Sequence, residues 1–300
     1  MRYLVVGLGN IGQKRVALLG ERCVATVDPV NRKADARSPQ ECALDDYAAA
    51  ILAVPNEVKL ELLEWFLARG KHVLVEKPLL FADRAQAERV ERLAQASGAV
   101  YYTAYNHRFE PLIERLKADV EEGRIGRLYH GRLLYGNGTA GNVRGTWRDQ
   151  GAGVLADLAP HLIDLVGYAL GRPGTEFRPW TAQRHECAAI DQAILGSADG
   201  ALTIEVSYLS WKNSFAIDLF GERGSMHLAG LRKWGVSELV MRERVLPSGV
   251  PRETRELSCG PDVTWQRELD HFEALSTSGA TSVENDWWIS QTINRVTGPC

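Results

Sequence analysis

The sequence has no apolar run long enough to cross a membrane, and strand-forming residues begin at Tyr3, which leaves no room for a signal peptide. Its five cysteines are odd in number, scattered and never spaced as C-x-x-C, so we expect free thiols in a reducing cytoplasm. The seven histidines are equally dispersed and predict no metal site. A net charge of −3 gives no electrostatic reason to expect nucleic acid or an anionic membrane as a partner.

The remaining composition is that of an ordinary globular protein, with 45% hydrophobic and 24% charged residues. A length of 300 residues exceeds one dinucleotide-binding fold and predicts two domains that share a cleft.

The most informative segment is an apolar strand beginning at Tyr3, which runs directly into a turn of the form G-x-G-x-x-G. Gly7 allows a tight turn, Gly9 lets the backbone approach a pyrophosphate, and Gly12 lets the next helix pack closely on the sheet. The helix expected from about residue 11 to 19 directs its free N–H groups at the phosphates. The turn therefore predicts a dinucleotide site, and a strand–turn–helix that binds nothing is the alternative.

A second short strand ends in Asp28, 19 residues after Gly9, where the acid that binds the ribose is expected. A carboxylate accepts hydrogen bonds from both ribose hydroxyls of NAD and repels the 2′-phosphate of NADP. Arg32 and Lys33 follow closely and could bind that phosphate, although a solvated pair of loop charges is the simpler interpretation. The sequence favours NAD as cofactor and leaves NADP open.

The first 105 or so residues alternate predicted strands and helices, as a doubly wound parallel sheet requires. The carboxyl ends of parallel strands meet at one edge, where such sheets collect their binding groups, and we expect residues 106–108 to join that rim. The predicted cofactor-binding residues are Gly7, Gly9, Asn10, Ile11, Gly12, Asp28, Val54, Pro55, Asn56, Glu76 and Lys77.

After a linking helix near residues 112–120 the pattern changes to long β-rich stretches. Within the stretch at residues 201–211, residues 202–208 alternate apolar and polar side chains, which is typical of a sheet with two unlike faces. We therefore predict an α/β protein with a Rossmann domain at residues 1–120 and an α+β domain with an open, mostly antiparallel sheet at residues 121–300. Six of the eight tryptophans lie beyond residue 170. We expect them to fill the core of the second domain, with a subunit contact as the alternative.

A helical pattern at residues 151–165 places polar groups on one side of an apolar helix. At about 100° per residue, Asp157, His161 and Asp164 fall within about 60° of one another. Pro160 removes a hydrogen bond and clashes with the preceding turn, so either Asp157 lies near the start of the regular helix or the helix is kinked there. Such a polar stripe either lines a site or faces solvent.

Five short motifs follow one another: G-x-G-x-x-G, Glu76-Lys77-Pro78, N-H-R-F-E-P at 106–111, Trp147-Arg148, and Asp157-x-x-x-His161-x-x-Asp164. Their order and spacing match a family pattern from residue 1 to about residue 230. Together they resemble the glucose–fructose oxidoreductase and inositol dehydrogenase family (Gfo/Idh/MocA). The resemblance implies that Lys77, Asp157 and His161 form the catalytic group. Two departures stand out. A histidine common after the Pro-Asn pair is absent, where Glu57-Val58-Lys59 stands, and the usual triple glycine before the catalytic helix contains Ala152.

These residue types suit the oxidation of a secondary alcohol, in which hydride leaves carbon while a base takes the hydroxyl proton. His161 titrates near neutral pH and is the expected base, acting as the acid in the reverse direction. Lys77 can hydrogen-bond the reacting oxygen and stabilise alkoxide charge, and a plain surface lysine is the alternative. Asp157 can hold the imidazole or favour its protonated form.

The polar, glycine-rich segment at residues 137–145 can close over a ligand. Arg108, Arg144 and Arg148 suit the recognition of a carboxylate or phosphate. They favour an anionic substrate, such as a nucleotide-linked sugar or a sugar acid, over a neutral polyol. Ordinary ion pairs are the equal alternative. The predicted substrate-binding residues are Asn106, Arg108, Arg144, Trp147, Arg148, Asp157 and His161.

The predicted function is hydride transfer between NAD(P) and a secondary alcohol or ketone of a sugar or sugar derivative. Two alternatives stay open: a glycosidase of the same family that uses bound NAD transiently, and a cofactor-sensing regulator without catalysis. We expect a homodimer or homotetramer formed through the exposed face of the second sheet, with no metal, nucleic acid or membrane partner.

Overall fold

The computed structural model describes residues 1–277, 279 and 281–297. Contacts divide the chain into two compact units: residues 1–104 with 265–290, and residues 105–264 with the described residues from 291 on. This division differs from the predicted single boundary at residue 120, because the chain returns to the first unit after residue 264. No helix among the described residues is long and apolar enough to cross a membrane.

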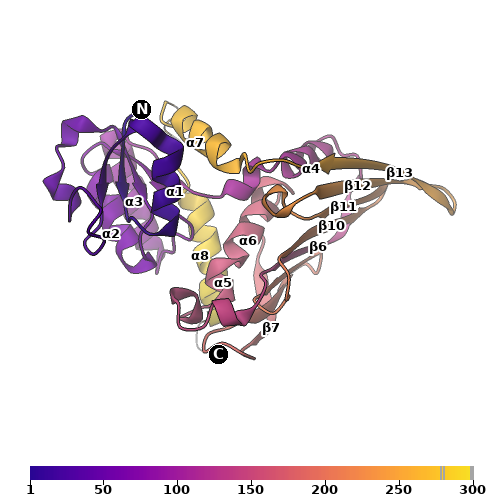
Figure 1. The fold of residues 1–300 in the computed structure, drawn as a ribbon. Coiled ribbons are helices and arrows are strands. Elements are labelled where there is room, and N and C mark those ends of the chain that lie inside the picture. The colour runs from indigo at the N-terminus through magenta and orange to yellow at the C-terminus, as the bar shows by residue number, and fades with distance from the viewer. Residues whose placement is uncertain (278, 280, 298–300) are drawn as a thin grey trace. The chain divides into compact units, whose positions relative to one another are not determined.

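The first unit is built on five parallel strands in the order β2-β1-β3-β4-β5 (Figure 1). The strands are β1 (Tyr3–Val6), β2 (Cys23–Val27), β3 (Ala49–Leu52), β4 (His72–Val75) and β5 (Tyr101–Thr103). The strand order reverses between β1 and β3, so the loops after these two strands flank the crevice where such sheets bind ligands. The predicted doubly wound parallel sheet is confirmed.

Helices cover both faces of this sheet, which is why every residue of β1 and β3 is buried. Leu4 and Val6 pack in a core with α2 (Asn56–Leu67) and α3 (Arg84–Ser97). On the other face, Tyr3 and Val5 pack with Leu19 of α1 (Asn10–Leu19) and with Leu269 and Phe272 of α7 (Thr264–Leu275). Both α7 side chains are fully buried. The chain returns to the first unit because α1 alone leaves part of this apolar face uncovered.

Both ends of α3 carry typical helix caps. Asp83 caps the helix by accepting a hydrogen bond from the Gln86 backbone N–H at 2.9 Å. Gly98 follows the last turn in the left-handed conformation, with φ +67°.

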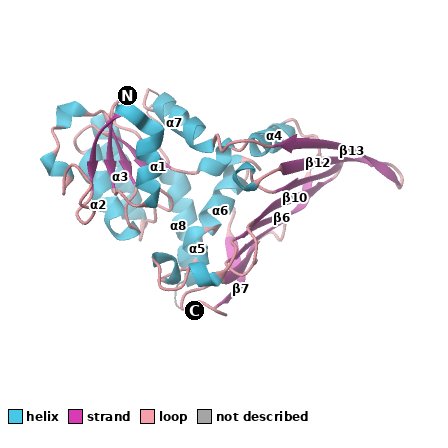
Figure 2. Cartoon of the chain, viewed as in Figure 1, coloured by secondary structure: helices cyan, strands magenta, loops and turns pink. Residues whose placement is uncertain are grey.

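The second unit is built on one sheet of eight strands in the order β13-β12-β11-β10-β6-β9-β8-β7 (Figure 2). All neighbouring strands run antiparallel except β6 and β9, so the predicted mostly antiparallel sheet is confirmed. The strands are β6 (Leu128–Gly136), β7 (Phe177–Gln183), β8 (Gln192–Ser197), β9 (Leu202–Ser207), β10 (Ser214–Gly221), β11 (Gly224–Ala229), β12 (Ser237–Val245) and β13 (Gly249–Ser258).

Helices pack on one face of this sheet, which we call its inner side. They are α4 (Pro111–Glu121), α5 (Val154–Asp157) and α6 (Ala159–Tyr168), while α8 (Val283–Thr297) begins in the first unit and ends in the second. Contacts join α4 to β11, β12 and β13, and join α5 and α6 to β9. Leu202, Ile204, Val206 and Tyr208 are buried as the period-two pattern predicts, because they share the inner side.

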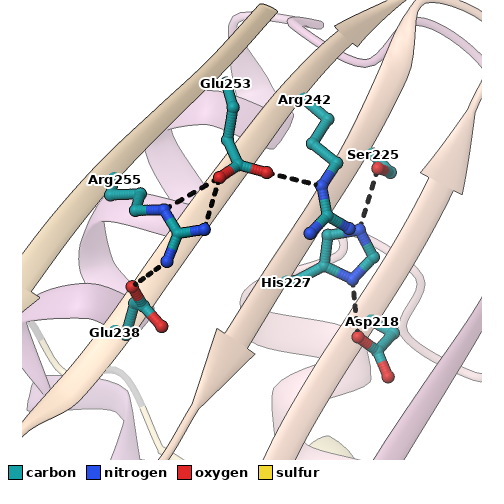
Figure 3. Close-up of polar contacts among 7 residues, drawn as sticks. All are labelled: Asp218, Ser225, His227, Glu238, Arg242, Glu253 and Arg255. Atoms are coloured by element: carbon teal, nitrogen blue, oxygen red, sulfur yellow. Dashed lines mark hydrogen bonds and ion pairs between the residues drawn. The ribbon is translucent and has the colours of Figure 1, made fainter. Parts of the chain in front are cut away.

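Charged pairs link the strands at the other side of the sheet (Figure 3). The Glu253 carboxylate accepts from Arg242 Nε at 2.8 Å and pairs with Arg255 Nη2 at 2.6 Å, so its pKa lies below the ordinary value. His227 bridges neighbouring strands through Nδ1, 2.7 Å from Asp218 Oδ1. Opposite charges facing one another across strands stabilise the pairing and keep this part of the surface polar.

The tryptophan prediction is wrong in its main point. Trp180 and Trp211 belong to the second unit but are 63% and 67% exposed. Trp265 and Trp287 belong to the first unit, where Trp287 packs against the core. Trp265, Trp287 and Trp288 cannot fill the second core because they belong to the part of the chain that has returned to the first unit.

Candidate active site

The glycine-rich turn of the first unit requires glycine at two of its three positions. Gly7 has φ +92°, and a Cβ there would lie 2.3 Å from the carbonyl oxygen of Ala53. A Cβ on Gly12 would lie 1.8 Å from the carbonyl oxygen of Gly7, so this glycine allows the helix to approach the turn. A Cβ on Gly9 would meet no atom within 4 Å, so the space in front of Gly9 is open.

The start of α1 suits a phosphate in that space. Within the described chain no side chain caps this helix, so its first N–H groups are left for another acceptor. Gly9, Asn10 and Ile11 are exposed there. An open glycine beside uncapped N–H groups fits the pyrophosphate of a dinucleotide.

Asp28 is fixed against the same turn. Its Oδ2 accepts from the Leu8 backbone N–H at 2.8 Å, and its Oδ1 accepts from the N–H groups of Val30 and Asn31 at 2.9 and 2.8 Å. Partial burial alone would raise the pKa of Asp28, but these three N–H donors outweigh it and lower the pKa. An ionised carboxylate offers about four acceptor sites, so room remains for a hydroxyl donor.

Three basic residues lie on the loop that follows Asp28, and one of them, Arg37, was not predicted to take part in the site. Arg37 donates through Nη1 to the carbonyl oxygens of Asp28 and Asn31 at 3.2 and 3.0 Å. Arg32 and Lys33 are exposed in the intervening loop. A guanidinium tied to the loop that carries Asp28 keeps binding of the NADP 2′-phosphate open.

Glu76 and Lys77 follow β4 at the carboxyl edge of the first sheet, and the Lys77–Pro78 peptide bond is cis. Lys77 is half-buried. The Glu76 carboxylate accepts from Arg15 Nε at 2.8 Å, and Arg15 is only 1% exposed. Arg15 also bonds Glu268 Oε2 at 2.6 Å and lies over the Trp265 ring at 4.2 Å. This segment is therefore held by a buried cation that no sequence motif indicated.

In the second unit the predicted helical run at residues 151–165 is two helices, because it is interrupted at Leu158 between α5 and α6. Pro160 lies in the first turn of α6, where a missing N–H breaks no helical hydrogen bond. Asp157, His161 and Asp164 are 2%, 5% and 1% exposed. A solvated helix face is therefore ruled out for all three.

Asp157 contacts two residues that are distant in the sequence. The Tyr208 hydroxyl donates to Asp157 Oδ2 at 3.2 Å, and Tyr208 is fully buried. Burial, with the charge of Asp157, raises the pKa of Tyr208, which keeps the hydroxyl protonated as a donor. Arg148 Nε lies 2.9 Å from Asp157 Oδ2, but its N–H points at no acceptor, so the contact is an ion pair without a directed hydrogen bond.

His161 lies in an aromatic cluster. Its ring stacks on His107 at a centroid distance of 4.0 Å, and Tyr135 lies 5.8 Å from it. His107 Nδ1 is 3.0 Å from Asn106 Oδ1, and Asn106 Nδ2 donates to Thr264 Oγ1 at 2.9 Å. His107 therefore links the His161 ring to Asn106.

The predicted substrate arginines all have partners. Arg108 makes a two-pronged pair with the buried Asp164, with Nε 2.8 Å from Oδ2. Arg144 donates through Nε to the Glu186 carbonyl oxygen at 2.6 Å. Arg148 pairs with Asp157 and lies over Trp147, which is 51% exposed. These contacts favour the ion-pair alternative for the arginines over anion recognition.

The predicted site residues therefore fall into two groups, each described within its own unit. The cofactor residues and Lys77 lie at the carboxyl edge of the first sheet, whereas Asn106, Asp157 and His161 lie in the second unit. No motif in the sequence pointed to Tyr208, and His107 stands in the N-H-R-F-E-P motif without a predicted role. No group of three or more metal-ligating side chains occurs in the described ranges.

Comparisons with known proteins cover both units. Residues 1–105 match an oxidoreductase family described as having an NAD-binding Rossmann fold. Residues 113–227 match the family described as the GFO/IDH/MocA C-terminal domain.

Individual relatives are distant. The chain is 28% identical over 186 residues to an uncharacterized oxidoreductase of Escherichia coli, which covers 60% of this chain and 53% of that protein. It is 25% identical over 214 residues to inositol 2-dehydrogenase of Rhizobium meliloti, covering 66% and 62%. Both matches span less than two thirds of the relative's length.

Among solved structures, levoglucosan dehydrogenase in complex with NADH superposes with a TM-score of 0.81 at 17% identity, covering 99% of this chain and 95% of the other. At this identity the similarity shows the fold alone.

Proposed function

Because the chain belongs to the Gfo/Idh/MocA family of oxidoreductases, with an NAD-binding Rossmann domain, we propose that it transfers a hydride between NAD and a secondary alcohol or ketone of a sugar. The observation that carries the proposal is the burial of Asp157 and His161 next to the break between α5 and α6. Buried titratable groups with polar partners are typical of a site that moves protons.

The first unit would hold the cofactor. The uncapped start of α1 and the open face of Gly9 suit the pyrophosphate, and Asp28 suits the ribose hydroxyls. Val54, Pro55 and Asn56 follow β3, and Val54 lies directly beside Gly7 of the glycine turn. When bound, NAD supplies the hydride acceptor.

The proton chemistry falls to this chain's own residues. His161 takes the hydroxyl proton during oxidation and returns it in the reverse direction. Lys77 donates a hydrogen bond to the reacting oxygen and offsets its developing negative charge. Asp157 pairs with the Arg148 guanidinium and lies four residues before His161, where it would hold the imidazole or stabilise its protonated form.

The proposed substrate is a sugar or sugar derivative, and a screen is needed to decide between a neutral and an anionic one. The sequence favours an anionic sugar because of Arg108, Arg144 and Arg148, but all three have protein partners. A panel of neutral sugars, polyols, sugar acids and nucleotide sugars should therefore be screened with NAD and NADP, following absorbance of the reduced cofactor. Turnover of one class supports the proposal and identifies the preferred cofactor.

The same screen separates the alternatives. Release of free sugar with no net NADH formation would indicate the NAD-using glycosidase. Tight NADH binding without turnover of any panel member would indicate the regulator and contradict the proposal.

Two further parts of the proposal concern the state of the protein. We expect a homodimer or homotetramer, measurable by light scattering, whose contact through the second sheet includes the polar pairs around Glu253 and His227 (Figure 3). We also expect a cytoplasmic location, in keeping with the free thiols of Cys23, Cys42, Cys187 and Cys259.

A further inference from the structure

Lys59 is a lysine at a core position of α2. It lies on the same helical face as Leu63 and Phe66, four and seven residues further on, and it is 3% exposed. A buried amine is costly unless its N–H groups find acceptors. Its hydrogen bonds are therefore informative about why a lysine occupies this position.

Both hydrogen bonds of Lys59 reach the segment that carries Lys77. Nζ donates to the carbonyl oxygen of Glu76 at 2.6 Å and to that of Pro78 at 2.8 Å. These two carbonyls immediately precede and follow Lys77 in the chain. The amine therefore bridges the backbone on both sides of the proposed catalytic lysine.

The backbone of this segment needs such a donor. The Glu76 N–H still bonds the Leu52 carbonyl oxygen at 2.9 Å, but β4 itself ends at Val75. Beyond the strand end a carbonyl has no ladder partner, and Pro78 brings no N–H of its own. Lys59 supplies from α2 the donors that the sheet no longer provides.

Glu76 is held from a second helix as well. Its carboxylate accepts from Arg15 of α1, while its carbonyl oxygen accepts from Lys59 of α2. We propose that Lys59 is a positioning residue, which fixes the Glu76–Lys77–Pro78 backbone so that the Lys77 amine is presented in one orientation. This inference rests on the proposed function, in which Lys77 bonds the reacting oxygen.

The protonation state of Lys59 is compatible with this role. Burial lowers the pKa of Lys59 to about 7, an effect that Lys77 reinforces and that Glu76, Asp286 and Glu57 oppose. A neutral amine retains two N–H donors, which is the number that the two carbonyls require. The anchor therefore persists when the charge is lost.

The test compares wild type with Lys59→Met, which keeps the length of the side chain and removes its donors. Acetic anhydride labelling of each lysine, followed by mass spectrometry over a range of pH, reports the environment of Lys77 without any substrate. We expect Lys77 to label about threefold faster or more in Lys59→Met, because its backbone opens locally, while Lys71 labels as in wild type. General destabilisation would accelerate both lysines.

Lys71→Met is the matched control. Lys71 is another lysine of the first unit whose Nζ donates to a backbone carbonyl oxygen, that of Tyr47 at 3.0 Å, away from residues 76–78. In this variant, acetic anhydride should label Lys77 at the wild-type rate. On the substrate found in the screen, Lys59→Met should lower kcat by about 10- to 100-fold with little change in NADH affinity, as misplacement of a reacting group does.

The inference is overturned if Lys59→Met folds cooperatively and acetic anhydride labels its Lys77 at the wild-type rate. If Lys59→Met does not fold, the labelling rate of Lys77 in Lys59→Ala is the deciding measurement. The space left by this smaller side chain admits water to both carbonyl oxygens, and water does not tie them to α2. The two proposals fail separately. Full turnover by Lys77→Ala would remove Lys77 from the proposed mechanism, whereas the labelling result would still decide whether Lys59 positions the Lys77 side chain.

Discussion

The two units build their parts of the candidate site in different ways. In the first unit the site consists of strand ends and turns, and its glycine turn is shaped by backbone positions near one another in the chain, as Gly7 and Gly12 are. In the second unit it consists of side chains brought together from distant segments. Tyr208 and Asp157 are 51 residues apart, and Arg108 and Asp164 are 56 residues apart. A site made by the backbone leaves a spacing in the sequence, whereas a site made by long-range side-chain pairs leaves only isolated residues.

The largest expected effect is on turnover, and it tests whether residues of both units contribute to one reaction. Lys77→Ala in the first unit and His161→Ala in the second should each lower turnover by about two to four orders of magnitude, because the proposed mechanism gives each side chain a role in stabilising the transition state. The affinity for NADH, measured by fluorescence titration, should change little. Near-normal turnover in either variant would remove that residue from the mechanism.

The next prediction separates structural from ligand-binding glycines in the first unit. Gly12→Ala places a Cβ 1.8 Å from the Gly7 carbonyl oxygen, so we expect a loss of about 3 kcal/mol or more in the free energy of unfolding. Gly9→Ala meets no protein atom within 4 Å and has a φ of −77° that alanine adopts readily. Its stability in urea should stay within about 1 kcal/mol of wild type, while its dissociation constant for NADH rises about tenfold or more. Equal loss of stability in both variants would contradict the distinction.

How much could be predicted from the sequence follows from the same difference. The alternation of strands and helices in the first unit was predictable, because each strand is a short apolar run bounded by turn residues. The return of α7 was not predicted. Leu269 and Phe272 indicate that this helix has a buried face, but only the fold determines which sheet that face covers.

Single residues of the site carried signals that could have been used. Tyr208 continues the buried side of an alternating strand, where a hydroxyl needs a partner. Lys59 shares helical spacing with Leu63 and Phe66, so a lysine was predictable in the core. Their partners, Asp157 and the carbonyls beside Lys77, were not predictable, because they depend on how distant elements pack.

The buried amine of Lys59 predicts a pH dependence of stability. Its pKa is about 7 in the folded protein and near 10.5 when the chain unfolds, so between these values the unfolded state binds more protons. Stability contributed by this site is therefore lowest below pH 7 and rises as pH increases toward 10.5. Relative to Lys59→Met, wild type should gain on the order of 2 kcal/mol between pH 7 and pH 9 in urea unfolding.

Subtracting the variant cancels the other groups that titrate in this range. A difference between wild type and Lys59→Met that stays constant from pH 7 to pH 9 would show that the amine keeps an ordinary pKa. A difference that falls with pH would have the opposite sign and would contradict the burial argument.

The smallest effect compares two buried tyrosine hydroxyls, one in each unit. Tyr208 donates to a buried carboxylate in the second unit, whereas the Tyr47 hydroxyl of the first unit is buried and meets no partner among the described residues. Tyr208→Phe should lower the free energy of unfolding by about 1–2 kcal/mol, because it removes a donor from Asp157. Tyr47→Phe should be neutral or slightly stabilising, because it removes a hydroxyl that pays for desolvation without a bond. Equal effects of the two variants in urea unfolding would mean that the Tyr208–Asp157 contact contributes nothing. The long-range pairs of the second unit would then be consequences of its packing and not part of what holds Asp157 in place.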